Sequence, residues 1–441
     1  MNNFSKFISS IKIFFKRRII LISVENFNRE FAGKKILSRH FAEQGYIVLL
    51  AHKSVVRVLV SNLPLKNQIY IEKGNRYGSY RYLSKAKKNN LLIYAFDEEG
   101  LMQTDFDTYL KRNHEKKTLG IIDGIFSWGP NHSDLLRASG FRENQILKTG
   151  NTRFDHYLNL IKNKPKDYFS NNEIILICSR FASANPNKLI KSKQDKRDGS
   201  NEYIEDSKKI LNLMILLPRL IREANIKNKI IVRPHPSESK YIWINACKGL
   251  ENVSVTCEEP INDVLLRTKF LIHNRCTTAI EASLMHVKVI SYEPIFLKSP
   301  PNPSKELMDS FSNYICKTDF ELLESLKLNG KNKNSKRSKT TKRFIYNLHD
   351  LSSLNIVQTL SRKHNYLTNN NFPQLLLIFF YLPIVIIHHK IFEIIYKIFR
   401  KKHYLYLKQK NGCINSKGFI KKYKKFQQLN LFSKITLFFP N

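Results

Sequence analysis

The sequence is poor in the residues that build metal and redox sites. Its 441 residues include six cysteines, which are scattered, with no Cys-x-x-Cys pair and no Cys/His cluster at metal-ligand spacing. We therefore expect reduced thiols in a cytosolic compartment. A Walker loop, a GxGxxG fingerprint and a pair of acids at metal-binding spacing are absent as well. These absences disfavour ATP chemistry and nicotinamide redox chemistry, and we expect neither a metal nor a cofactor.

We expect no segment that crosses a membrane or directs secretion. The stretch Leu375–Ile387 is apolar but only thirteen residues long, whereas a spanning helix needs about 20. Met1–Lys16 has apolar residues at helical spacing, but three lysines interrupt them and no small-residue cleavage site follows. An amphipathic surface helix fits this stretch better than a secretory signal does. We expect the protein to stay on the cytoplasmic side.

Acidic residues are few, with 36 Asp and Glu against 74 Lys and Arg, which gives a net charge of +38. The excess is concentrated in residues 331–441, where 22 basic residues accompany only Asp350 and Glu393. This distribution points to an anionic partner. Because 42% of the residues are hydrophobic, we expect a folded protein. The length of the chain, 441 residues, allows two or three domains.

The basic C-terminal segment has an amphipathic pattern. Ile391, Ile394, Ile395 and Ile398 share one helical face, the opposite face carries Lys390, Glu393, Lys397 and Arg400, and Lys421–Lys425 adds a basic cluster. This pattern favours a helix lying on an anionic lipid surface. A core helix with solvated lysines remains an alternative. Nucleic acid is disfavoured as a partner because no recognition helix and no RNP-type aromatic pair is present. We expect a chain cut before Phe372 to stay folded but to lose vesicle binding.

Short apolar stretches alternate with helical stretches along the body. The predicted strands are Arg18–Val24, Tyr46–Ala51, Gln68–Ile71, Leu91–Phe96, Gly124–Trp128, Ile146–Thr149, Ile174–Cys178, Lys229–Val232, Val253–Thr256, Phe270–His273 and Val287–Tyr292. The predicted helices are Gly33–Glu43, Ser54–Asn62, Ser79–Asn89, Phe106–His114, His132–Ala138, Tyr203–Ala224, Ala279–Met285 and Phe344–Arg362. This alternation predicts an α/β protein with two doubly wound, Rossmann-like domains and a C-terminal basic amphipathic helical tail.

Domain boundaries follow from the polar stretches. Residues 1–165 form the expected first domain, 173–330 the second, and 331–441 a linker, a return helix and the tail. Pro165–Asn172 and Asn329–Lys342 are predicted linkers, and Lys188–Asn201 is a predicted charged insertion.

Three polar stretches follow predicted strands, where open α/β sheets bind ligands. They are Asp97-Glu98-Glu99-Gly100, Arg233-Pro234-His235-Pro236 with Ser237-Glu238, and His273-Asn274-Arg275-Cys276-Thr277-Thr278. Mutual repulsion among three adjacent acids is expected to raise at least one pKa, which suits a general base. Arg233 can neutralise an anionic leaving group and His235 can donate a proton to it.

Each stretch also has a plain structural interpretation. The acids could form a solvated turn that ends at Gly100, and the Arg-Pro-His-Pro segment could be a rigid loop. Thr278 and Glu281 have the spacing of a capping box at a helix N-terminus. Capping and phosphate binding are compatible because both use the same end of the helix.

These motifs together resemble known enzymes. Three of them resemble motifs of bacterial CMP-sugar-using GT-B glycosyltransferases, the sialyl- and Kdo-transferase groups. Glu98-Glu99-Gly100 is similar to their acidic-Gly motif, His235-Pro236 to their His-Pro motif and Thr277-Thr278 to their Ser-Ser/Thr motif. Order and domain placement agree as well. More broadly, residues 18–320 resemble bacterial capsule and O-antigen biosynthesis proteins. That likeness is carried by Glu25 with Arg29, the Asp-Glu-Glu-Gly loop, Gly150-Asn151-Thr152-Arg153-Phe154-Asp155 and the Arg-Pro-His-Pro loop.

The resemblance implies a metal-independent glycosyltransferase that moves a sugar from a nucleotide donor, CMP-linked, to a lipid-linked glycan at the inner face of the bacterial membrane. Glu98, the first acid of the matching pair, would be the general base or acceptor-side carboxylate, with Glu99 beside it in the catalytic set, and His235 would assist departure of the phosphate. The donor side would comprise Arg233, Pro236, Glu238, Asn274, Thr277, Thr278 and Glu281. The remaining cleft candidates are Asp97, Gly100, Glu25, Arg29, Asn151, Arg153, Asp155 and Arg180.

Three other functions remain open. A CDP-glycerol-type phosphotransferase would also use a His-Pro loop, and a non-hydrolysing sugar-nucleotide epimerase would need no acceptor. A non-catalytic assembly protein of the polysaccharide machinery would keep the fold without the chemistry.

Overall fold

The computed structural model describes residues 14–76, 78–101, 107, 109–110, 115–162, 173–187, 201–295, 303–327, 337–368, 371–399, 428–430 and 435–438. Most of the predicted helix Phe106–His114, the linker Pro165–Asn172, most of the insertion Lys188–Asn201, most of the linker Asn329–Lys342, the cluster Lys421–Lys425 and nearly all of Met1–Lys16 lie outside these ranges. The chain forms two compact units. Unit 1 comprises the described residues up to His156, Lys342–Phe399 and the two C-terminal strands, and unit 2 those from Tyr157 to Thr341.

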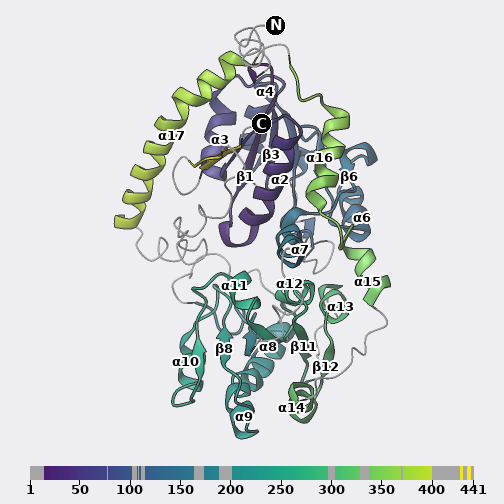
Figure 1. Cartoon of the computed structure of the whole chain (residues 1–441), viewed down its shortest axis with the longest axis vertical. Coiled ribbons are helices and arrows are strands. Elements are labelled where there is room, and N and C mark those ends of the chain that lie inside the picture. Colours follow the sequence, from purple (N-terminus) through teal and green to yellow (C-terminus); the bar gives the residue numbers. More distant parts are fainter. Residues whose placement is uncertain are drawn as a thin grey trace. The chain divides into compact units, whose positions relative to one another are not determined.

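Unit 1 is built on a sheet with six parallel strands (Figure 1). In the order β2-β1-β3-β4-β5-β6, these are Ile47–His52, Ile19–Val24, Ile69–Glu72, Leu92–Ala95, Gly124–Phe126 and Ile146–Leu147. Two strands from the far end of the chain extend it, because β14 (Ile435–Phe438) pairs antiparallel with β2 and β13 (Gln428–Asn430) with β14.

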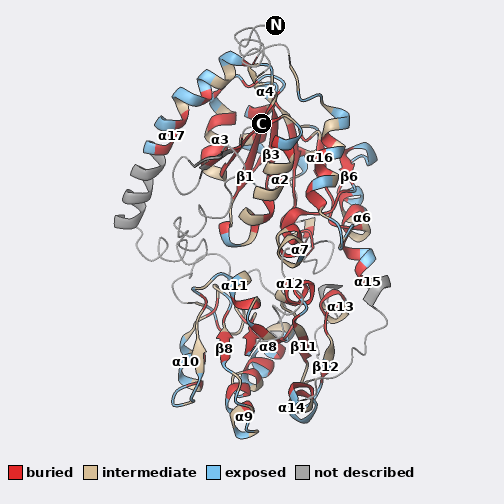
Figure 2. Cartoon of the chain, in the orientation of Figure 1, coloured by how far each residue is buried: buried red, intermediate tan, exposed pale blue. Residues whose placement is uncertain are grey.

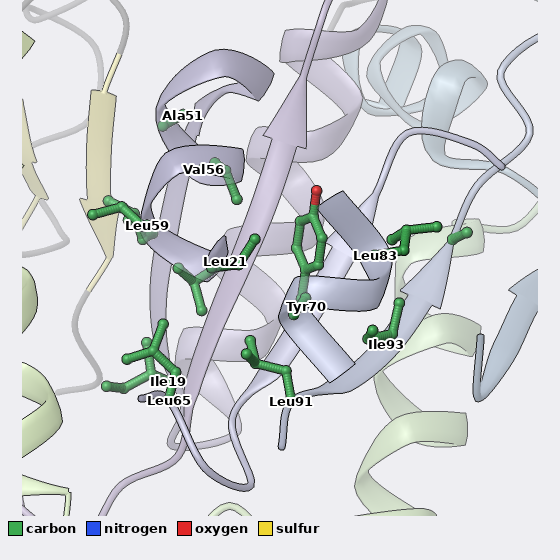
Figure 3. Close-up of a cluster of buried hydrophobic side chains, with 14 of the residues drawn as sticks. Ile19, Leu21, Ala51, Val56, Leu59, Leu65, Tyr70, Leu83, Leu91 and Ile93 are labelled. Atoms are coloured by element: carbon green, nitrogen blue, oxygen red, sulfur yellow. The ribbon is translucent and has the colours of Figure 1, made fainter. Parts of the chain in front are cut away.

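Helices cover both faces of this sheet. Those described are α2 (Ala32–Glu43), α3 (Lys53–Asn62), α4 (Tyr80–Lys88), α6 (Pro130–Ala138), α16 (Ser352–Lys363) and α17 (Phe372–Phe399), with short turns η1 (Phe27–Phe31), η2 (Lys116–Thr118), η3 (Glu143–Gln145) and η4 (Thr152–Phe154). Two further helices, α7 (Asp155–Lys162) and α15 (Arg337–Phe344), each contain residues of both units. Successive residues of β1 enter two separate cores: Ile19 and Leu21 pack with α3 and α17, and Ile20 and Ile22 with α2 and α16. This alternation is the two-residue period of a strand buried on both faces (Figures 2 and 3).

Unit 2 contains a second sheet of six parallel strands. In the order β12-β11-β10-β7-β8-β9, these are Tyr314–Cys316, Lys288–Tyr292, Thr268–His273, Ile174–Cys178, Ile230–Arg233 and Val253–Val255. Its described helices are α8 (Asn201–Met214), α9 (Leu217–Glu223), α10 (Tyr241–Ala246), α11 (Ile261–Leu265), α12 (Thr278–Leu284), α13 (Pro303–Ser310) and α14 (Asp319–Lys327). The predicted architecture of two doubly wound α/β domains is therefore confirmed.

Several element boundaries differ from the sequence-based expectation. The predicted helix Tyr203–Ala224 is two helices, α8 and α9, and Pro218 lies in the first turn of α9, where its missing N–H costs no hydrogen bond. Between the predicted strand Arg18–Val24 and the predicted helix Gly33–Glu43, the chain is already partly helical, because η1 begins at Phe27 and runs directly into α2. After the Arg-Pro-His-Pro segment, the next helix, α10, begins at Tyr241.

The helix α17 is part of the fold rather than an appendage. Ile378, Leu382, Val385 and Ile386 are buried in the same core as β1 and α3. Removing the chain from Phe372 onward would expose that core, so from the structure we expect such a truncation to destabilise unit 1, contrary to the expectation from the sequence. The described part of the chain holds no helix that is long and apolar enough to span a bilayer.

Candidate functional site

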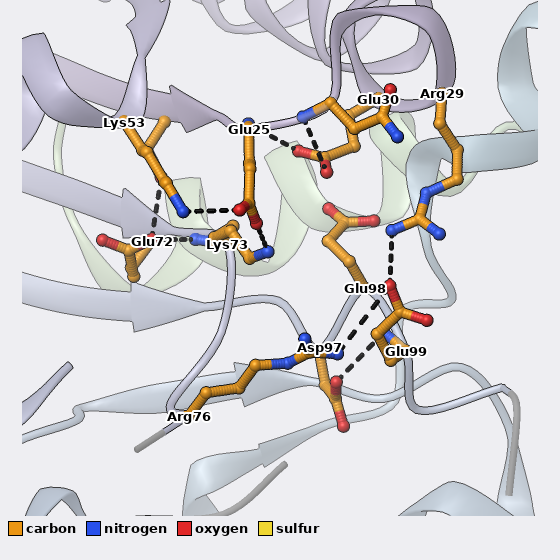
Figure 4. A network of polar contacts seen from close by, with 12 residues as sticks. Glu25, Arg29, Glu30, Lys53, Glu72, Lys73, Arg76, Asp97, Glu98 and Glu99 are labelled. Atoms are coloured by element: carbon orange, nitrogen blue, oxygen red, sulfur yellow. Dashed lines mark hydrogen bonds and ion pairs between the residues drawn. The ribbon is translucent and has the colours of Figure 1, made fainter. Parts of the chain in front are cut away.

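Charged residues follow each of the first four strands of unit 1 at the carboxyl edge of the sheet. Glu25 follows β1, Lys53 follows β2, Lys73 follows β3 and Asp97–Glu99 follow β4. The Glu25 carboxylate lies 2.5 Å from the Lys53 Nζ and is also paired with Lys73 (Figure 4). The chain passes from β1 to β2 on one side and then crosses back to β3 on the other side of β1. In open α/β sheets, ligands bind beyond the carboxyl ends of the strands at such a reversal point. Unit 1 therefore presents a charged candidate site between the ends of β1 and β3.

The three adjacent acids do not act on one another as expected. Glu98 is buried, and its carboxylate oxygen lies 2.9 Å from the Lys34 Nζ, which lies 3.0 Å from Glu30. Lys34 is itself 1% exposed. Lys34 thus pairs with both buried glutamates and fixes the Asp97–Glu99 loop onto α2.

Glu99 is the most exposed of the three acids, with about a third of its side chain open to solvent (32%). Burial alone would raise its pKa, but Arg29, 2.7 Å away, and Arg76, 3.7 Å away, hold the pKa well below its ordinary range. Figure 4 shows Arg29 and Arg76 meeting Glu99 from two different segments. Glu99 is therefore ionised at neutral pH.

Asp97 is buried in a separate hydrogen-bonded group. The Tyr109 hydroxyl donates to it at 2.8 Å and His132 Nε2 lies 3.4 Å away. Burial favours the neutral acid, yet the hydrogen bond and charge of His132 lower the pKa of Asp97 overall. The expectation that mutual repulsion raises a pKa is thus wrong for Asp97 and Glu99. Gly100 is required here, because a side chain on it would overlap the His132 ring.

The Gly150–Asp155 segment is buried within unit 1. The Asn151 side chain accepts the backbone N–H of Arg153 at 2.9 Å, and both residues are at most 8% exposed. Asp155 accepts the backbone N–H groups of Ser352 and Ser353 at 3.0 and 2.8 Å, and so caps the start of α16. Burial raises the pKa of Asp155 to about 7. In this structure the segment anchors the returning C-terminal helix to the sheet.

In unit 2, the strand order reverses between β7 and β10, which places Arg180 and Arg275 beside each other. The Arg180 Nη1 donates to the Arg275 carbonyl at 3.3 Å. Both line a small pocket with Asn274 and residues of α8; its other lining residues are Phe181, Tyr203, Asp206, Ser207 and Ile210. Arg275 adopts a left-handed φ of 55°, which is uncommon for a residue with a side chain and often marks a functional site. Its Nη2 is buried without a hydrogen-bond partner among the described residues.

The Arg-Pro-His-Pro loop lies at the end of β8 and is held by Glu238. That buried carboxylate accepts the Ser179 hydroxyl at 2.8 Å and the Phe181 N–H at 2.7 Å, and the His235 N–H lies 3.3 Å away. Burial raises the pKa of Glu238 to about 7. Glu238 therefore joins the loops after β7 and β8. Arg233 donates from Nη1 to the Glu259 carbonyl at 2.7 Å, and Pro236 accepts from Asn187.

His235 is exposed and its tautomer is indicated by the loop. The Ser237 N–H donates to His235 Nδ1 at 3.2 Å. Because Nδ1 is an acceptor, the neutral ring carries its proton on Nε2. His235 can therefore offer an N–H to an anion beyond the end of β8.

The segment after β10 differs from its predicted form. Helix α12 begins at Thr278, and its N-cap residue, Thr277, makes no side-chain capping bond, so the predicted capping box of Thr278 with Glu281 is wrong. The Thr278 hydroxyl lies 3.3 Å from the Cys276 Sγ instead. Asn274 is buried and donates to the Tyr292 carbonyl at 2.8 Å. Glu281 is buried inside α12.

A thiol pair lies at the same point of unit 2. Cys178 ends β7 opposite His273 of β10, and Cys276 follows three residues later. A hydrogen bond between the two thiols, assisted by Thr278, lowers the pKa of Cys276 to about 6, and the pKa of Cys178 is raised well above its ordinary range. The lowered pKa favours the thiolate form of Cys276.

Sequence reasoning missed several of these residues. Lys34 had a usable signal, since it lies four residues after Glu30 on a helix. Arg275 and Cys276 belong to a stretch that was singled out, but their importance depends on the order of strands in the sheet. Among the described residues, no group of three His, Cys, Asp or Glu side chains could hold a metal ion.

No protein-family model and no curated protein matches the sequence. Among solved structures, UDP-GlcNAc 2-epimerase from Methanocaldococcus jannaschii, in complex with UDP-GlcNAc and UDP, aligns with a TM-score of 0.52 at 15% identity over 78% of this chain and 99% of that one. A putative UDP-N-acetylglucosamine 2-epimerase from Listeria monocytogenes gives 0.51 at 11% identity, over 79% and 96%. A further UDP-N-acetylglucosamine 2-epimerase gives 0.50 at 12%, over 80% and 98%. This likeness shows the fold, two Rossmann-like domains of the GT-B type.

Proposed function

We propose that this protein is a metal-independent glycosyltransferase that uses a nucleotide-sugar, CMP-linked, as its donor. The acceptor is a lipid-linked glycan of surface polysaccharide biosynthesis, which brings the enzyme to the anionic inner face of the cytoplasmic membrane as a peripheral protein. The CMP preference and the acceptor follow from the motif resemblance. The observation that carries the proposal is the paired arginines at the strand reversal of unit 2.

The donor side is argued from charge and unfilled hydrogen-bonding capacity. Arg275 has a buried guanidinium nitrogen without a partner among the described residues, and it adjoins Arg180 in a pocket. A planar guanidinium pair is suited to a phosphate group. Thr277 and Thr278 add hydroxyls, while Glu238 fixes the loop that carries His235. In this assignment His235 donates from Nε2 to the departing phosphate.

The acceptor side is argued from exposure. Glu98 is closed off by Lys34, so its role is to hold the loop, whereas about a third of the Glu99 side chain is exposed. Its pKa is too low for a base while both arginines face it, and displacement of Arg29 or Arg76 by a bound substrate would raise that pKa toward its usual range. Glu99 is therefore the proposed acceptor-side carboxylate.

A second candidate is supported by the solved structures. The proteins of similar fold with the highest scores reported above carry the name UDP-GlcNAc 2-epimerase. An epimerase would act on the nucleotide-sugar alone, without an acceptor.

The two candidates predict different products. Purified protein is incubated with CMP-sugars and a bacterial lipid extract, or with UDP-GlcNAc alone, and the products are analysed by mass spectrometry. The transferase releases CMP and adds one sugar mass to a lipid, and Glu99→Gln or His235→Ala lowers the rate by about 10²–10⁴. Conversion of UDP-GlcNAc without a lipid supports the epimerase. A product that also gains phosphate indicates a phosphotransferase, and full activity of both variants would contradict the proposed roles.

A further inference from the structure

One side of α17 presents an apolar stripe to solvent. The outer stripe comprises Phe372, Leu376, Phe379, Phe380, Ile384 and Ile387, all exposed. Phe379 and Phe380 are 67% and 68% exposed, and Ile384 and Ile387 about 60% and 59%. Figure 2 shows α17 exposed on the side away from α3 and buried on the side facing it. The stripe is roughly 22 Å long at 1.5 Å per residue, and contiguous exposed apolar surface of this kind marks an interaction site.

The stripe has a fixed orientation on unit 1. The opposite face of the same helix holds Leu382 and Val385 in the core against α3. The start of α17 is held as well, because Gln68 donates to the Asn371 side chain at 2.7 Å and Asn371 donates to the Phe15 carbonyl at 2.7 Å. The outer stripe therefore cannot turn inward without dismantling the core.

The chain from Phe14 to Arg18 joins the stripe at its first residue. The Phe15 and Phe372 rings are 4.6 Å apart, and Thr368 donates to the Lys16 carbonyl at 2.7 Å. The basic and apolar N-terminal stretch Met1–Lys16 therefore leads directly to the start of α17. Among the described residues, Phe15 and Lys16 therefore lie at the start of α17.

Charge and polarity identify the partner as a lipid surface. Lys16 and Lys66 are exposed. The Lys16 carbonyl accepts from Thr368, and the Lys66 carbonyl accepts from Gln68, which also bonds Asn371, so both lie near the start of the stripe. In the sequence, His388, His389 and Lys390 follow its end. No acidic residue occurs between Asp350 and Glu393. The stripe itself offers no polar side chain, whereas protein interfaces average about one hydrogen bond per 100–200 Å². Apolar side chains bordered by cations are the composition of an interfacial helix on anionic lipid.

We propose that the outer stripe of α17 inserts into the headgroup–acyl boundary of an anionic bilayer and thereby anchors unit 1. In the sequence, Ile391, Ile394 and Ile398 follow Ile387 at three- and four-residue spacing, and the α17 backbone stays helical to Phe399. This inference deepens the membrane partner proposed above by naming the inserting surface. It is independent of the nucleotide chemistry.

The test is vesicle co-sedimentation of the full chain with phosphatidylcholine vesicles, with and without phosphatidylglycerol. Wild type is expected to pellet with the anionic vesicles, and the double variant Phe379→Glu/Phe380→Glu to bind roughly 100-fold more weakly, because two large apolar side chains no longer leave water. The matched control is Phe320→Glu in unit 2, a phenylalanine that is 74% exposed, which should bind like wild type. Unchanged binding of the double variant would overturn the proposal.

Insertion is separated from surface adsorption by a second measurement. In Phe380→Trp, brominated acyl chains should quench the new indole, while the native Trp128 and Trp243 are fully buried. Absence of quenching would overturn insertion. A wild-type dimer that the double variant converts to a monomer, with vesicle binding retained, would assign the stripe to a second copy instead. Nucleotide-induced thermal shifts in the double variant should equal those of wild type, so a failed donor assignment is detected separately.

Discussion

At the residue scale, the most consequential feature is the buried group Glu30–Lys34–Glu98. One lysine between two glutamates leaves a net negative charge inside unit 1, offset in part by N–H groups of Glu25 and Asn26 that point at Glu30. Burial lowers the pKa of Lys34, but the two carboxylates raise it above its ordinary value overall. The lysine therefore stays charged, and the loop that carries Glu99 depends on it.

Removal of this lysine should destabilise unit 1 strongly. Lys34→Met leaves two buried carboxylates without their cation, and loss of one partner of a buried pair costs about 3–5 kcal/mol. The neighbouring Lys35→Met, at a partly exposed position, should change the free energy of unfolding by less than about 1 kcal/mol. Urea unfolding followed by circular dichroism measures both, and equal stabilities of the two variants would contradict the buried ion pairs.

Cys276 gives a chemical probe of the unit 2 site. Its lowered pKa, about 6, predicts that the alkylation rate rises as pH increases through about 6 and is nearly level at pH 8, because the thiolate is the reactive form. Cys247, whose pKa burial raises, should react only at higher pH. Iodoacetamide labelling with peptide mass spectrometry follows both thiols. If nucleotide binds beside Arg275, CMP should slow the labelling of Cys276. A labelling rate of Cys276 that rises only near pH 9 would contradict the lowered pKa that the neighbouring Cys178 thiol is inferred to cause.

At the element scale, local sequence patterns located the strands that carry the site. β1, β7, β8 and β10 each agree with the prediction to within two residues at either end, because a run of buried β-branched and aliphatic residues is a strong local signal. The division of the Tyr203–Ala224 helix was missed although Pro218 was visible in the sequence. β14 was missed because Ile435–Phe438 follows a long basic segment, and its pairing with β2 is made across more than 380 residues.

The two faces of α17 should respond differently to truncation of a side chain. Leu382→Ala empties a buried position in the core shared with α3, and such losses cost about 2–5 kcal/mol. Ile384→Ala, two residues further and 60% exposed, should leave the free energy of unfolding nearly unchanged. Thermal and urea unfolding of the two variants measure this difference. Similar effects at both positions would contradict the packing of the helix.

At the scale of the whole molecule, the sequence predicted which residue types gather at strand ends but not how they are partnered. The order of the strands decides that Arg180 meets Arg275 and that Glu25 meets Lys73, and this order is a long-range property of the folded sheet. The same holds for Glu98, whose partner Lys34 lies on α2. The candidate acids were therefore identified from sequence, while the exposure that favours Glu99 over Glu98 required the structure.

The measurement that tests the central claim most directly is nucleotide binding to the full chain. Thermal shift and calorimetry with CMP, CDP, UDP and GDP are compared for wild type, His235→Ala and Arg275→Ala, with Phe320→Glu as a control away from the proposed site. We predict selective stabilisation of wild type by CMP, weakened in both site variants and retained in the control. Preference for UDP would transfer the assignment to the epimerase, and no stabilisation by any nucleotide would contradict a nucleotide-sugar enzyme.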